Sequence, residues 1–349
     1  MANEDVFFYV NGPARLLMSC VIADELFPNH RKHLILLDQF GYRYEGLLPH
    51  LADRFERVIR LPLPAERYSH ADQFIGTYFN RFPQLRSFLR PDSTVILFGI
   101  RSPAQKFMVS YAKRLNCRVE IYAESLAVDR YFTARPSETV VTALGRRLFR
   151  RAFDYQHDYD VFYVPDPDVY QDSPWRSKLA KMFDLYGAPS FRRYAELLTR
   201  EVDLTGLDLY DTVLLGQPLS NYETFLTPSQ EEAMLQTMIG ERAVLVLPHP
   251  NERLDPGRDK YRVLPNAKVL KGEIPSELLL LALYPKETIT FYSTASVNYA
   301  MMNKSSVNLF YPIHKTKFDM LCRFQRSLPN MVVSSDFLIS HDPYAASGT

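Results

Sequence analysis

The chain has 349 residues, of which 46% are hydrophobic, and it carries 41 Lys+Arg against 40 Asp+Glu. This length suffices for one large or two ordinary domains with buried cores. A net charge of +1 argues against a partner bound mainly through bulk charge, such as nucleic acid. The longest apolar stretch, Leu278–Tyr284, is far shorter than the roughly 18 residues that a membrane span needs. Three widely spaced cysteines indicate neither a disulfide framework nor a metal-binding pair, and the acidic start does not predict a signal peptide. We therefore expect a cytoplasmic globular protein.

Short apolar runs alternate with helical patterns through the first 165 residues. Nearly continuous apolar runs are typical of strands covered on both faces, so the alternation predicts a parallel α/β sheet. The expected strands are Val6–Val10, Leu34–Leu37, Val58–Leu61, Val95–Gly99, Val119–Tyr122 and Val161–Val164. The expected helices are Pro13–Leu26, Gln73–Leu89 and Pro103–Leu115.

A second alternation follows a break rich in Pro and Asp, Pro165–Trp175, and a helical stretch, Arg176–Arg200. Its expected strands are Thr212–Leu215, Ala243–Leu247, Thr288–Tyr292 and Val307–Phe310, and its expected helices are Pro228–Met238 and Ser276–Leu283. Thr227 and Gln230 form a capping-box pattern before the first of these helices. We predict two doubly wound, Rossmann-like domains that face each other across a cleft. They are residues 1–165 and 206–325, separated by a linker with a helical segment, 166–205, and followed by a tail, 326–349. Ligands bind such sheets outside the carboxyl ends of the strands.

The segment Ala243–Asn251 reads AVLVLPHPN and places His249 directly after an apolar strand. A proline on either side restricts the backbone, which suits an imidazole that must be aimed. A histidine at this edge can donate to a phosphate oxygen or act as a general acid. The alternative is a turn histidine that only hydrogen-bonds its own loop.

Two helix starts follow in the same domain. In the segment Thr288–Tyr299, a strand is expected to end at Ser293 and Thr294 and a helix to begin at about Ala295. The hydroxyls and the free backbone N–H groups of such a helix start can bind an anion. Glu277, in the first turn after Pro275, can accept hydrogen bonds from a ribose diol. The alternatives are an ordinary Ser/Thr cap and an ordinary first-turn acid.

Glu124 follows a strand of the first domain, where a carboxylate can take a proton from an acceptor hydroxyl. The alternative is that Glu124 is an acidic residue of a solvated loop. Three site segments at successive strand ends of the second domain, with an acid on the first, together describe a GT-B glycosyltransferase.

Three motifs resemble the bacterial GT-B sialyltransferases, a group that includes the lipooligosaccharide sialyltransferases and the capsular polysialyltransferases. They are LPHP at Leu247–Pro250, IPSELLL at Ile274–Leu280 and YSTAS at Tyr292–Ser296. The segment LLGQPLS at Leu214–Ser220 also looks like the first strand of that group's nucleotide domain. The resemblance covers most of the chain in order and is stronger in the C-terminal half.

The resemblance implies a CMP-sugar donor in the second domain and a glycan acceptor in the first. His249 would contact the phosphate and stabilise or protonate the leaving group, and Ser293 and Thr294 would hold the same phosphate. Glu277 would take the ribose hydroxyls. The residues expected to border the nucleotide are Gly216, Gln217 and Pro250. A single phosphate needs little charge neutralisation, so we expect no metal and no cofactor.

The acidic motif departs from that group, because its acid-acid-glycine becomes Glu124-Ser125-Leu126 here. Glu124 would be the general base, with Asp129 as the alternative. Attack from the opposite domain would invert the anomeric carbon. The resemblance implies sialic acid as the sugar, and the altered acidic motif leaves another CMP-activated nonulosonate or Kdo as the alternative. A GT-B-like enzyme of another reaction (a CDP-polyol phosphotransferase or a sugar-nucleotide epimerase) and a non-catalytic scaffold of capsule assembly stay open.

One basic segment stands out from the near-neutral chain. Its arginines, which separate from the apolar residues at helical spacing, are Arg146, Arg147, Arg150 and Arg151. Such a helix can contact anionic membrane lipid at the inner face of the cytoplasmic membrane or guide an anionic glycan. The alternative is a surface helix with its apolar stripe in the core.

Overall fold

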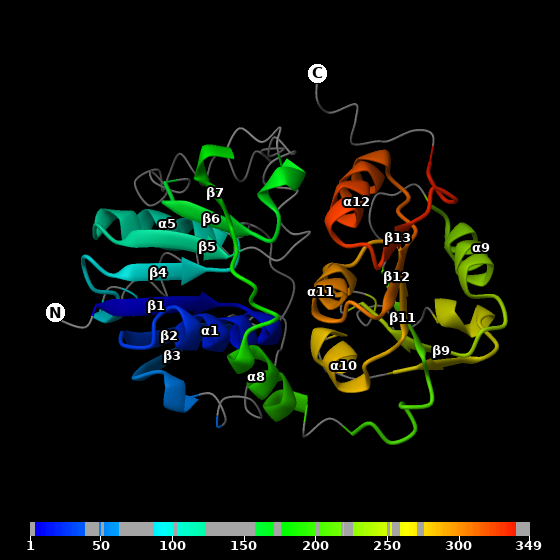
Figure 1. Cartoon of the computed structure of the whole chain (residues 1–349), viewed down its shortest axis with the longest axis horizontal. Helices are drawn as coiled ribbons and strands as arrows, with labels where there is room; N and C mark the ends of the chain where they lie inside the picture. Colours follow the sequence, from blue (N-terminus) through cyan, green and yellow to red (C-terminus); the bar gives the residue numbers. More distant parts are fainter. Residues whose placement is uncertain are drawn as a thin grey trace. The chain divides into compact units, whose positions relative to one another are not determined.

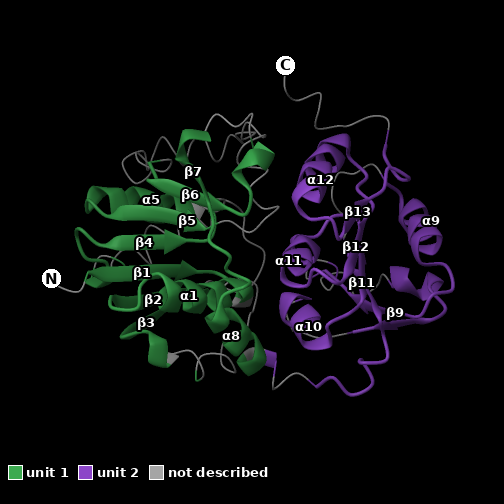
Figure 2. Ribbon diagram, in the orientation of Figure 1, with its two compact units in different colours: residues 1–198 green, residues 199–349 purple. Residues whose placement is uncertain are grey.

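The structure, a computed structural model, describes residues 4–38, 49, 52–62, 85, 87–100, 103–122, 158–170, 176–199, 203–217, 219, 226–249, 252, 259–270 and 276–339. The chain divides into two compact units, residues 1–198 and 199–349 (Figure 2). Each unit holds one parallel sheet with helices. In these described ranges, no helix is both long enough and apolar enough to cross a membrane.

Unit 1 contains a seven-stranded sheet in the order β3-β2-β1-β4-β5-β6-β7, and every pair is parallel (Figure 1). Its strands are β1 (Asp5–Val10), β2 (Arg31–Asp38), β3 (Arg57–Pro62), β4 (Thr94–Leu97), β5 (Arg118–Tyr122), β6 (Val161–Val164) and β7 (Leu179–Lys181). Among the described residues of this unit, the helices are α1 (Pro13–Glu25), α5 (Pro103–Arg114) and α8 (Pro189–Thr199), with short 3-10 turns at Ala52–Arg54, Pro167–Tyr170 and Arg176–Lys178.

All six strands predicted for the first half are confirmed, with ends that move by at most a few residues. The helical prediction for Arg176–Arg200 is wrong at its start, where a 3-10 turn and β7 precede α8. The reason is long-range, because Leu179–Lys181 pairs in parallel with β6 and extends the first sheet. The predicted helix Gln73–Leu89 lies mostly outside the described residues. Unit 1 thus includes residues 166–198 of the segment 166–205 that the sequence sets apart as a linker, and unit 2 begins at residue 199.

Unit 2 contains a six-stranded parallel sheet in the order β10-β9-β8-β11-β12-β13. Its strands are β8 (Thr212–Leu215), β9 (Val244–Leu247), β10 (Ala267–Val269), β11 (Glu287–Thr290), β12 (Val307–Phe310) and β13 (Met331–Val333). Its helices are α9 (Pro228–Ile239), α10 (Ser276–Leu283), α11 (Thr294–Met302) and α12 (Lys315–Ser327), with a 3-10 turn at Lys260–Val263. The sequence predicts neither β10, β13 nor α12, and β13 lies beyond the predicted domain end at residue 325.

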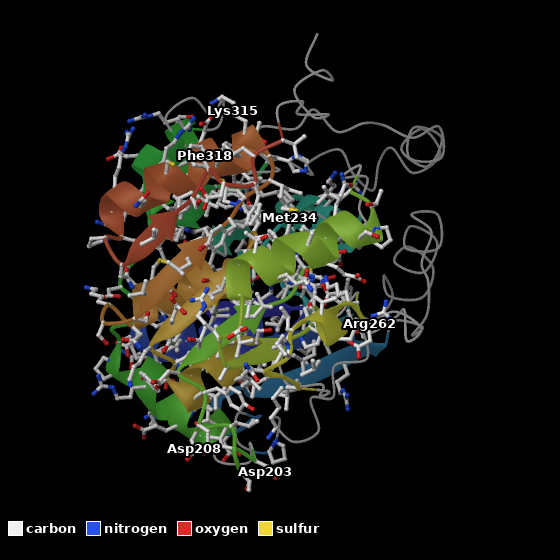
Figure 3. The ribbon with its side chains drawn as sticks, turned by 90° about the vertical axis from the view of Figure 1, so that its right-hand side faces the viewer. Asp203, Asp208, Met234, Arg262, Lys315 and Phe318 are labelled. Atoms are coloured by element: carbon white, nitrogen blue, oxygen red, sulfur yellow. The ribbon has the colours of Figure 1, made fainter. Side chains whose placement is uncertain are left out.

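The strands of unit 2 send alternate side chains to two helix-covered faces. Leu214 and Val246 join a core with residues of α9, whereas Leu215 and Leu247 join a core with residues of α10 and α11. Figure 1 shows α9 on one side of this sheet and α10 and α11 on the other. Figure 3 views unit 2 from the α9 side, where Met234 lies partly buried against the first core. Burial on both faces explains the continuous apolar runs of the strands.

Both sheets are doubly wound. In each, the first strand lies inside the sheet, the next two strands follow on one side, and the fourth strand pairs with the first on its other side. In unit 2 this reversal lies between β8 and β11, and sheets of this kind bind ligands outside the carboxyl ends of the strands at such a reversal. The predicted fold class, α/β with two Rossmann-like doubly wound domains, is confirmed.

Candidate functional site at the carboxyl edge of the second sheet

Three loops leave the second sheet from the same row of residues. Leu215, the last residue of β8, is in register with Leu247 on β9 and with Thr290 on β11. The Thr290 hydroxyl donates to the Leu215 carbonyl at 3.2 Å, which fixes the two strand ends together. The segments that begin there carry Gly216, His249 and, three residues beyond β11, Ser293. The fold therefore brings predicted residues from three distant parts of the sequence to adjacent strand ends.

Gly216 has no room for a side chain. A Cβ at this position would lie 2.1 Å from the Tyr261 hydroxyl, 2.8 Å from Glu252 Oε2 and 3.1 Å from Pro248 Cα. The Gly216 N–H donates to the Leu247 carbonyl at 2.9 Å and ties the loop after β8 to the end of β9. A glycine here follows from this close approach of two loops and a buried tyrosine.

His249 is half-buried, and two hydrogen bonds join its backbone to Glu252. The His249 N–H donates to Glu252 Oε2 at 3.1 Å, and the Glu252 N–H donates back to the His249 carbonyl at 2.9 Å. This reciprocal pair fixes the backbone that carries the imidazole. Pro250, the second predicted proline of the motif, lies outside the described residues.

A buried lysine, Lys260, links the loop after β8 to the loop after β9. Lys260 Nζ donates to Glu231 Oε1 at 2.5 Å and to Glu252 Oε1 at 2.7 Å, and it also donates to the Gln217 carbonyl at 2.5 Å. Glu231 is fully buried, and the side chains of Lys260 and Glu252 are 6% and 10% exposed. Tyr261 donates its hydroxyl to Glu252 Oε2 at 2.7 Å. Burial and the Glu252 charge raise the pKa of Tyr261 well above its ordinary value.

The hydroxyl side chains of the YSTAS motif, at the start of α11, fall into a half-exposed group and a buried group. Ser293 is the N-cap residue, yet its side chain makes no capping hydrogen bond, and both Ser293 and Thr294 are half-exposed. Ser296 is fully buried and lies 2.7 Å from the Thr288 hydroxyl on β11. Ser293 and Thr294 are therefore placed at the edge of the sheet, while Ser296 anchors the helix.

Glu277 lies in the first turn of α10, which begins at Ser276 as predicted. Leu279 and Leu280 of this helix pack in the same core as Ala295 of α11, so the two helices share one face of the sheet. Because α10 follows a parallel strand, its N-terminus lies toward the carboxyl edge. Glu277 is half-buried there.

Lys317 is a residue of this edge that the sequence does not point to. Its Nζ donates to the Tyr292 hydroxyl at 3.2 Å and lies 4.5 Å from the centre of the Tyr292 ring. Tyr292 directly precedes Ser293, so α12 brings a cation to the same strand end. The two residues are 25 positions apart, and Lys317 lies in α12, a helix that the sequence does not predict. The sequence alone therefore gives no sign of this pairing.

The proposed catalytic acids and the basic segment are outside the described part of the chain. These residues are Glu124, Asp129, Arg146, Arg147, Arg150 and Arg151. The strand before Glu124, β5, is confirmed and ends at Tyr122.

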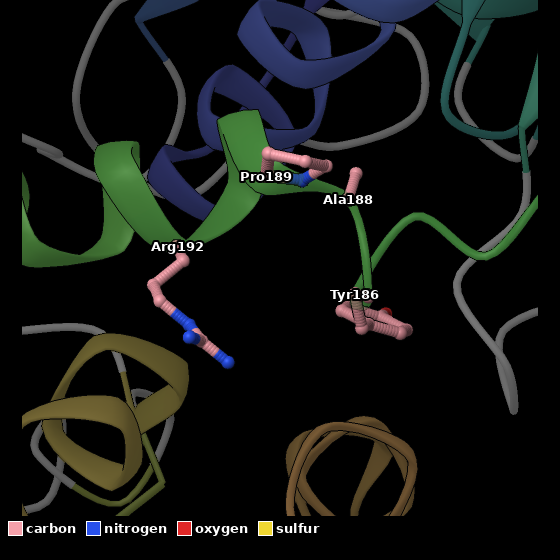
Figure 4. A pocket seen from close by; sticks show the side chains of 5 residues that line it. Tyr186, Ala188, Pro189 and Arg192 are labelled. Atoms are coloured by element: carbon pink, nitrogen blue, oxygen red, sulfur yellow. The ribbon is translucent and has the colours of Figure 1, made fainter.

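A pocket of about 300 Å³ lies at the start of α8 in unit 1. Its lining includes Tyr186, Pro189 and Arg192 (Figure 4). It contains none of the predicted site residues, so it does not mark the site that the sequence predicts.

No protein-family model and no curated protein matches the chain. Solved structures do match it. A UDP-glucosyltransferase from Polygonum tinctorium, capable of glucosylating indoxyl, is 14% identical with a TM-score of 0.51, over 99% of this chain and 89% of the other. A UDP-N-acetylglucosamine 2-epimerase from Rickettsia bellii is 13% identical with a TM-score of 0.55, over 99% of this chain and 86% of the other. An Arabidopsis thaliana protein in complex with UDP-L-rhamnose is 12% identical with a TM-score of 0.55, over 95% of this chain and 84% of the other. At such identities the similarity shows the fold alone: two parallel-sheet, Rossmann-like units of the GT-B class.

Proposed function

We propose that the chain is a glycosyltransferase that takes its sugar from a nucleotide donor bound at the carboxyl edge of the second sheet. One observation carries the proposal. Gly216, His249 and Ser293 leave three adjacent strands from a common row, at the point where the strand order reverses. A glycine that neighbouring groups approach closely, a histidine just beyond a strand end and a helix N-terminus without a side-chain cap can together bind a nucleotide phosphate.

The donor that we propose is a CMP-activated sugar, sialic acid or a related acid. Its support is the resemblance of the motifs around His249, Glu277 and Ser293 to the bacterial GT-B sialyltransferases. A single phosphate can be held by the α11 N-terminus, the hydroxyls of Ser293 and Thr294 and one histidine, without a metal. Glu277 then serves the ribose, and Gly216, Gln217 and Pro250 border the nucleotide.

The proposed reaction is a single inverting displacement. The acceptor hydroxyl oxygen attacks the anomeric carbon while its proton passes to Glu124, or to Asp129 in its place. The bond from the anomeric carbon to the phosphate oxygen breaks, and His249 stabilises or protonates the departing CMP. The acceptor that we propose is a bacterial surface glycan of the capsule or lipooligosaccharide type.

Nucleotide binding tests the proposal directly. The thermal unfolding midpoint is measured with CMP, UMP, GMP, CDP and UDP, each at a saturating concentration. We expect CMP to raise the midpoint most, since a ligand that binds only the folded state stabilises it by mass action. Absence of any shift with CMP contradicts a CMP-sugar donor, and absence of a shift with all five contradicts the nucleotide site.

A transfer assay with CMP-sialic acid then tests the residue roles. Glu124→Gln and Asp129→Asn are compared, and the variant that loses transfer while keeping CMP binding identifies the base. Loss in neither variant shows that the base lies elsewhere. Nucleotide binding without any turnover favours the non-catalytic scaffold.

The second candidate is a sugar-nucleotide epimerase that acts on a UDP-sugar. It is favoured by the similarity of fold to a UDP-N-acetylglucosamine 2-epimerase over 99% of this chain. Lys317 beside Tyr292 also supplies a cation that a second phosphate would use. Incubation with UDP-N-acetylglucosamine, followed by NMR of the sugar, decides between the candidates: a new 2-epimer supports this one, and unchanged substrate removes it.

A further inference from the structure

We propose that Lys260, Glu252 and Tyr261 are positioning residues, which hold the loop after β8 and the loop after β9 in one fixed arrangement. The inference rests on the proposed function insofar as those loops carry Gly216, Gln217 and His249. None of the three positioning residues needs to touch a ligand. They act instead by fixing the backbone of the two loops whose residues would contact the ligand.

The network reaches both loops through main-chain atoms. On the β9 side, Glu252 Oε2 accepts from the His249 N–H at 3.1 Å. On the β8 side, Lys260 Nζ donates to the Gln217 carbonyl at 2.5 Å, and Glu231 Oε1 accepts from the Leu219 N–H at 3.3 Å. Lys260 bridges the two carboxylates, so the loops are joined through one ammonium group.

Tyr261 closes this network against Gly216. Its hydroxyl donates to the same Glu252 Oε2 that accepts from His249, and the Gly216 Cα faces that hydroxyl without a side chain between them. Glu252 Oε2 therefore has two donors, one from Tyr261 and one from the His249 backbone. Removing the hydroxyl withdraws one of the groups that hold this carboxylate in place.

Stability alone gives little reason for this arrangement. Two carboxylates and an ammonium group are taken out of water here, and apolar residues of similar volume often stabilise such a site as well or better. Charged hydrogen bonds add direction, because each fixes a particular backbone atom. These buried charged groups lie next to the two loops of the candidate site, as expected for groups that position a site.

The test compares Tyr261→Phe with Tyr299→Phe. Both tyrosines are buried in unit 2, and each donates one hydrogen bond from its hydroxyl. Tyr299 bonds the Pro285 carbonyl, which precedes β11 and so lies at the opposite edge of the sheet. Each variant removes one buried tyrosine hydroxyl, and Tyr299→Phe also removes the acceptor of a hydrogen bond from Asn303. Only Tyr261→Phe removes a contact next to the candidate site.

Two quantities are measured in each variant: the exchange rate of the His249 amide hydrogen by NMR and the Kd for CMP. We expect Tyr261→Phe to speed the exchange and to weaken CMP binding by about 3- to 10-fold, the effect of one hydrogen bond. Tyr299→Phe should leave both at the wild-type values although its unfolding midpoint falls. Glu252→Asp, which keeps the charge but shortens the side chain, should reproduce the Tyr261→Phe result.

Equal exchange and equal Kd in Tyr261→Phe, Glu252→Asp and Tyr299→Phe would overturn the proposal and leave the network a purely structural role. The exchange measurement needs no ligand. If the wild-type protein binds no nucleotide, the proposed function fails, and the His249 exchange rates alone decide whether the network positions the loops.

Discussion

The Ser296 hydroxyl in the first turn of α11 lies 2.7 Å from the Thr288 hydroxyl on β11, and both groups are fully buried. Thr288 donates its own proton to Asn308 Oδ1 at 2.7 Å, so Ser296 is the donor to Thr288. This chain of hydrogen bonds runs from β12 through β11 into the helix. It holds the first turn of α11 on the sheet, and the hydroxyls of Ser293 and Thr294 stay available at the edge.

Alanine variants separate these two roles within one motif. Ser293→Ala combined with Thr294→Ala should weaken CMP binding by about tenfold and change the free energy of unfolding by less than about 0.5 kcal/mol, because both side chains are half-exposed and that of Ser293 makes no capping hydrogen bond. Ser296→Ala should destabilise the fold by about 1–3 kcal/mol, since it leaves the buried Thr288 hydroxyl without its donor. Calorimetric titration and urea unfolding measure the two effects. The assignment fails if the Ser293 and Thr294 variant binds CMP as well as the wild type.

Gly216→Ala should be less destabilising when the Tyr261 hydroxyl is absent. The new Cβ would lie 2.1 Å from the Tyr261 hydroxyl, so the single variant should lose about 1–3 kcal/mol of stability. Adding Tyr261→Phe removes that contact, and we expect a favourable coupling of at least about 0.5 kcal/mol in a double-mutant cycle. Urea unfolding of the four proteins measures it.

The control cycle pairs Gly216→Ala with Tyr299→Phe. Tyr299 has its hydroxyl partners at the other edge of the sheet, so these two effects should add. Equal coupling in both cycles would show that the Tyr261 hydroxyl does not limit the space at Gly216.

His249→Ala should weaken CMP binding by about 10- to 100-fold, which corresponds to one hydrogen bond to a charged group. The two backbone hydrogen bonds between His249 and Glu252 do not depend on the imidazole, so this backbone arrangement should be kept in the variant. His30→Ala, at another partly exposed histidine in unit 1, is the control and should leave the Kd unchanged. A wild-type Kd in His249→Ala would place the phosphate contact on another residue.

Asp5 makes the stability of unit 1 depend on pH. It accepts hydrogen bonds from His33 at 2.8 Å and from Arg31 at 3.0 Å, with Arg90 at 3.1 Å. Burial by itself raises the pKa of Asp5, but the His33 hydrogen bond and the charges of Arg90 and Arg31 outweigh it, and the pKa lies below its ordinary 3.8. The stabilisation is therefore present above about pH 4 and is lost as the pH falls through the lowered pKa.

Asp5→Asn should lower the free energy of unfolding by about 1.5–3 kcal/mol at pH 7, and the difference from the wild type should shrink toward pH 3. Urea unfolding at both pH values measures this. Asp208→Asn, an exposed position marked in Figure 3, should change little at either pH. A constant difference between wild type and Asp5→Asn across this range would contradict the ionic role of Asp5.

We propose that the basic segment contacts anionic lipid, so replacing Arg146, Arg147, Arg150 and Arg151 with Gln should strongly reduce binding to anionic lipid vesicles. Each arginine near such a surface contributes about 1 kcal/mol, so the loss of four should reduce partitioning by well over tenfold. Co-sedimentation with phosphatidylglycerol vesicles measures it, and phosphatidylcholine vesicles provide the neutral control. Equal sedimentation of the wild type and the variant would rule out membrane contact through this segment.

Local patterns predict the central elements of this fold well. The bounds of β8, β12 and α10 agree with the sequence prediction residue for residue. The capping box of Thr227 and Gln230 forms as predicted at the start of α9. Such features depend on hydrophobic period and on contacts within one turn, which neighbouring residues encode. His249 and Ser293 are placed at strand ends for the same reason.

What the sequence alone determined is thus the doubly wound pattern and the strand ends that carry the candidate site. Only the tertiary structure decided which distant residues support that site. The three-residue strands β7, β10 and β13 form because each pairs with the edge of a neighbouring strand. They are too short for a hydrophobic period to show in the sequence. Lys260 meets Glu231 across 29 residues, and Lys317 meets Tyr292 across 25. These charges come together through the strand order and the helix packing, which set distances that no local pattern contains.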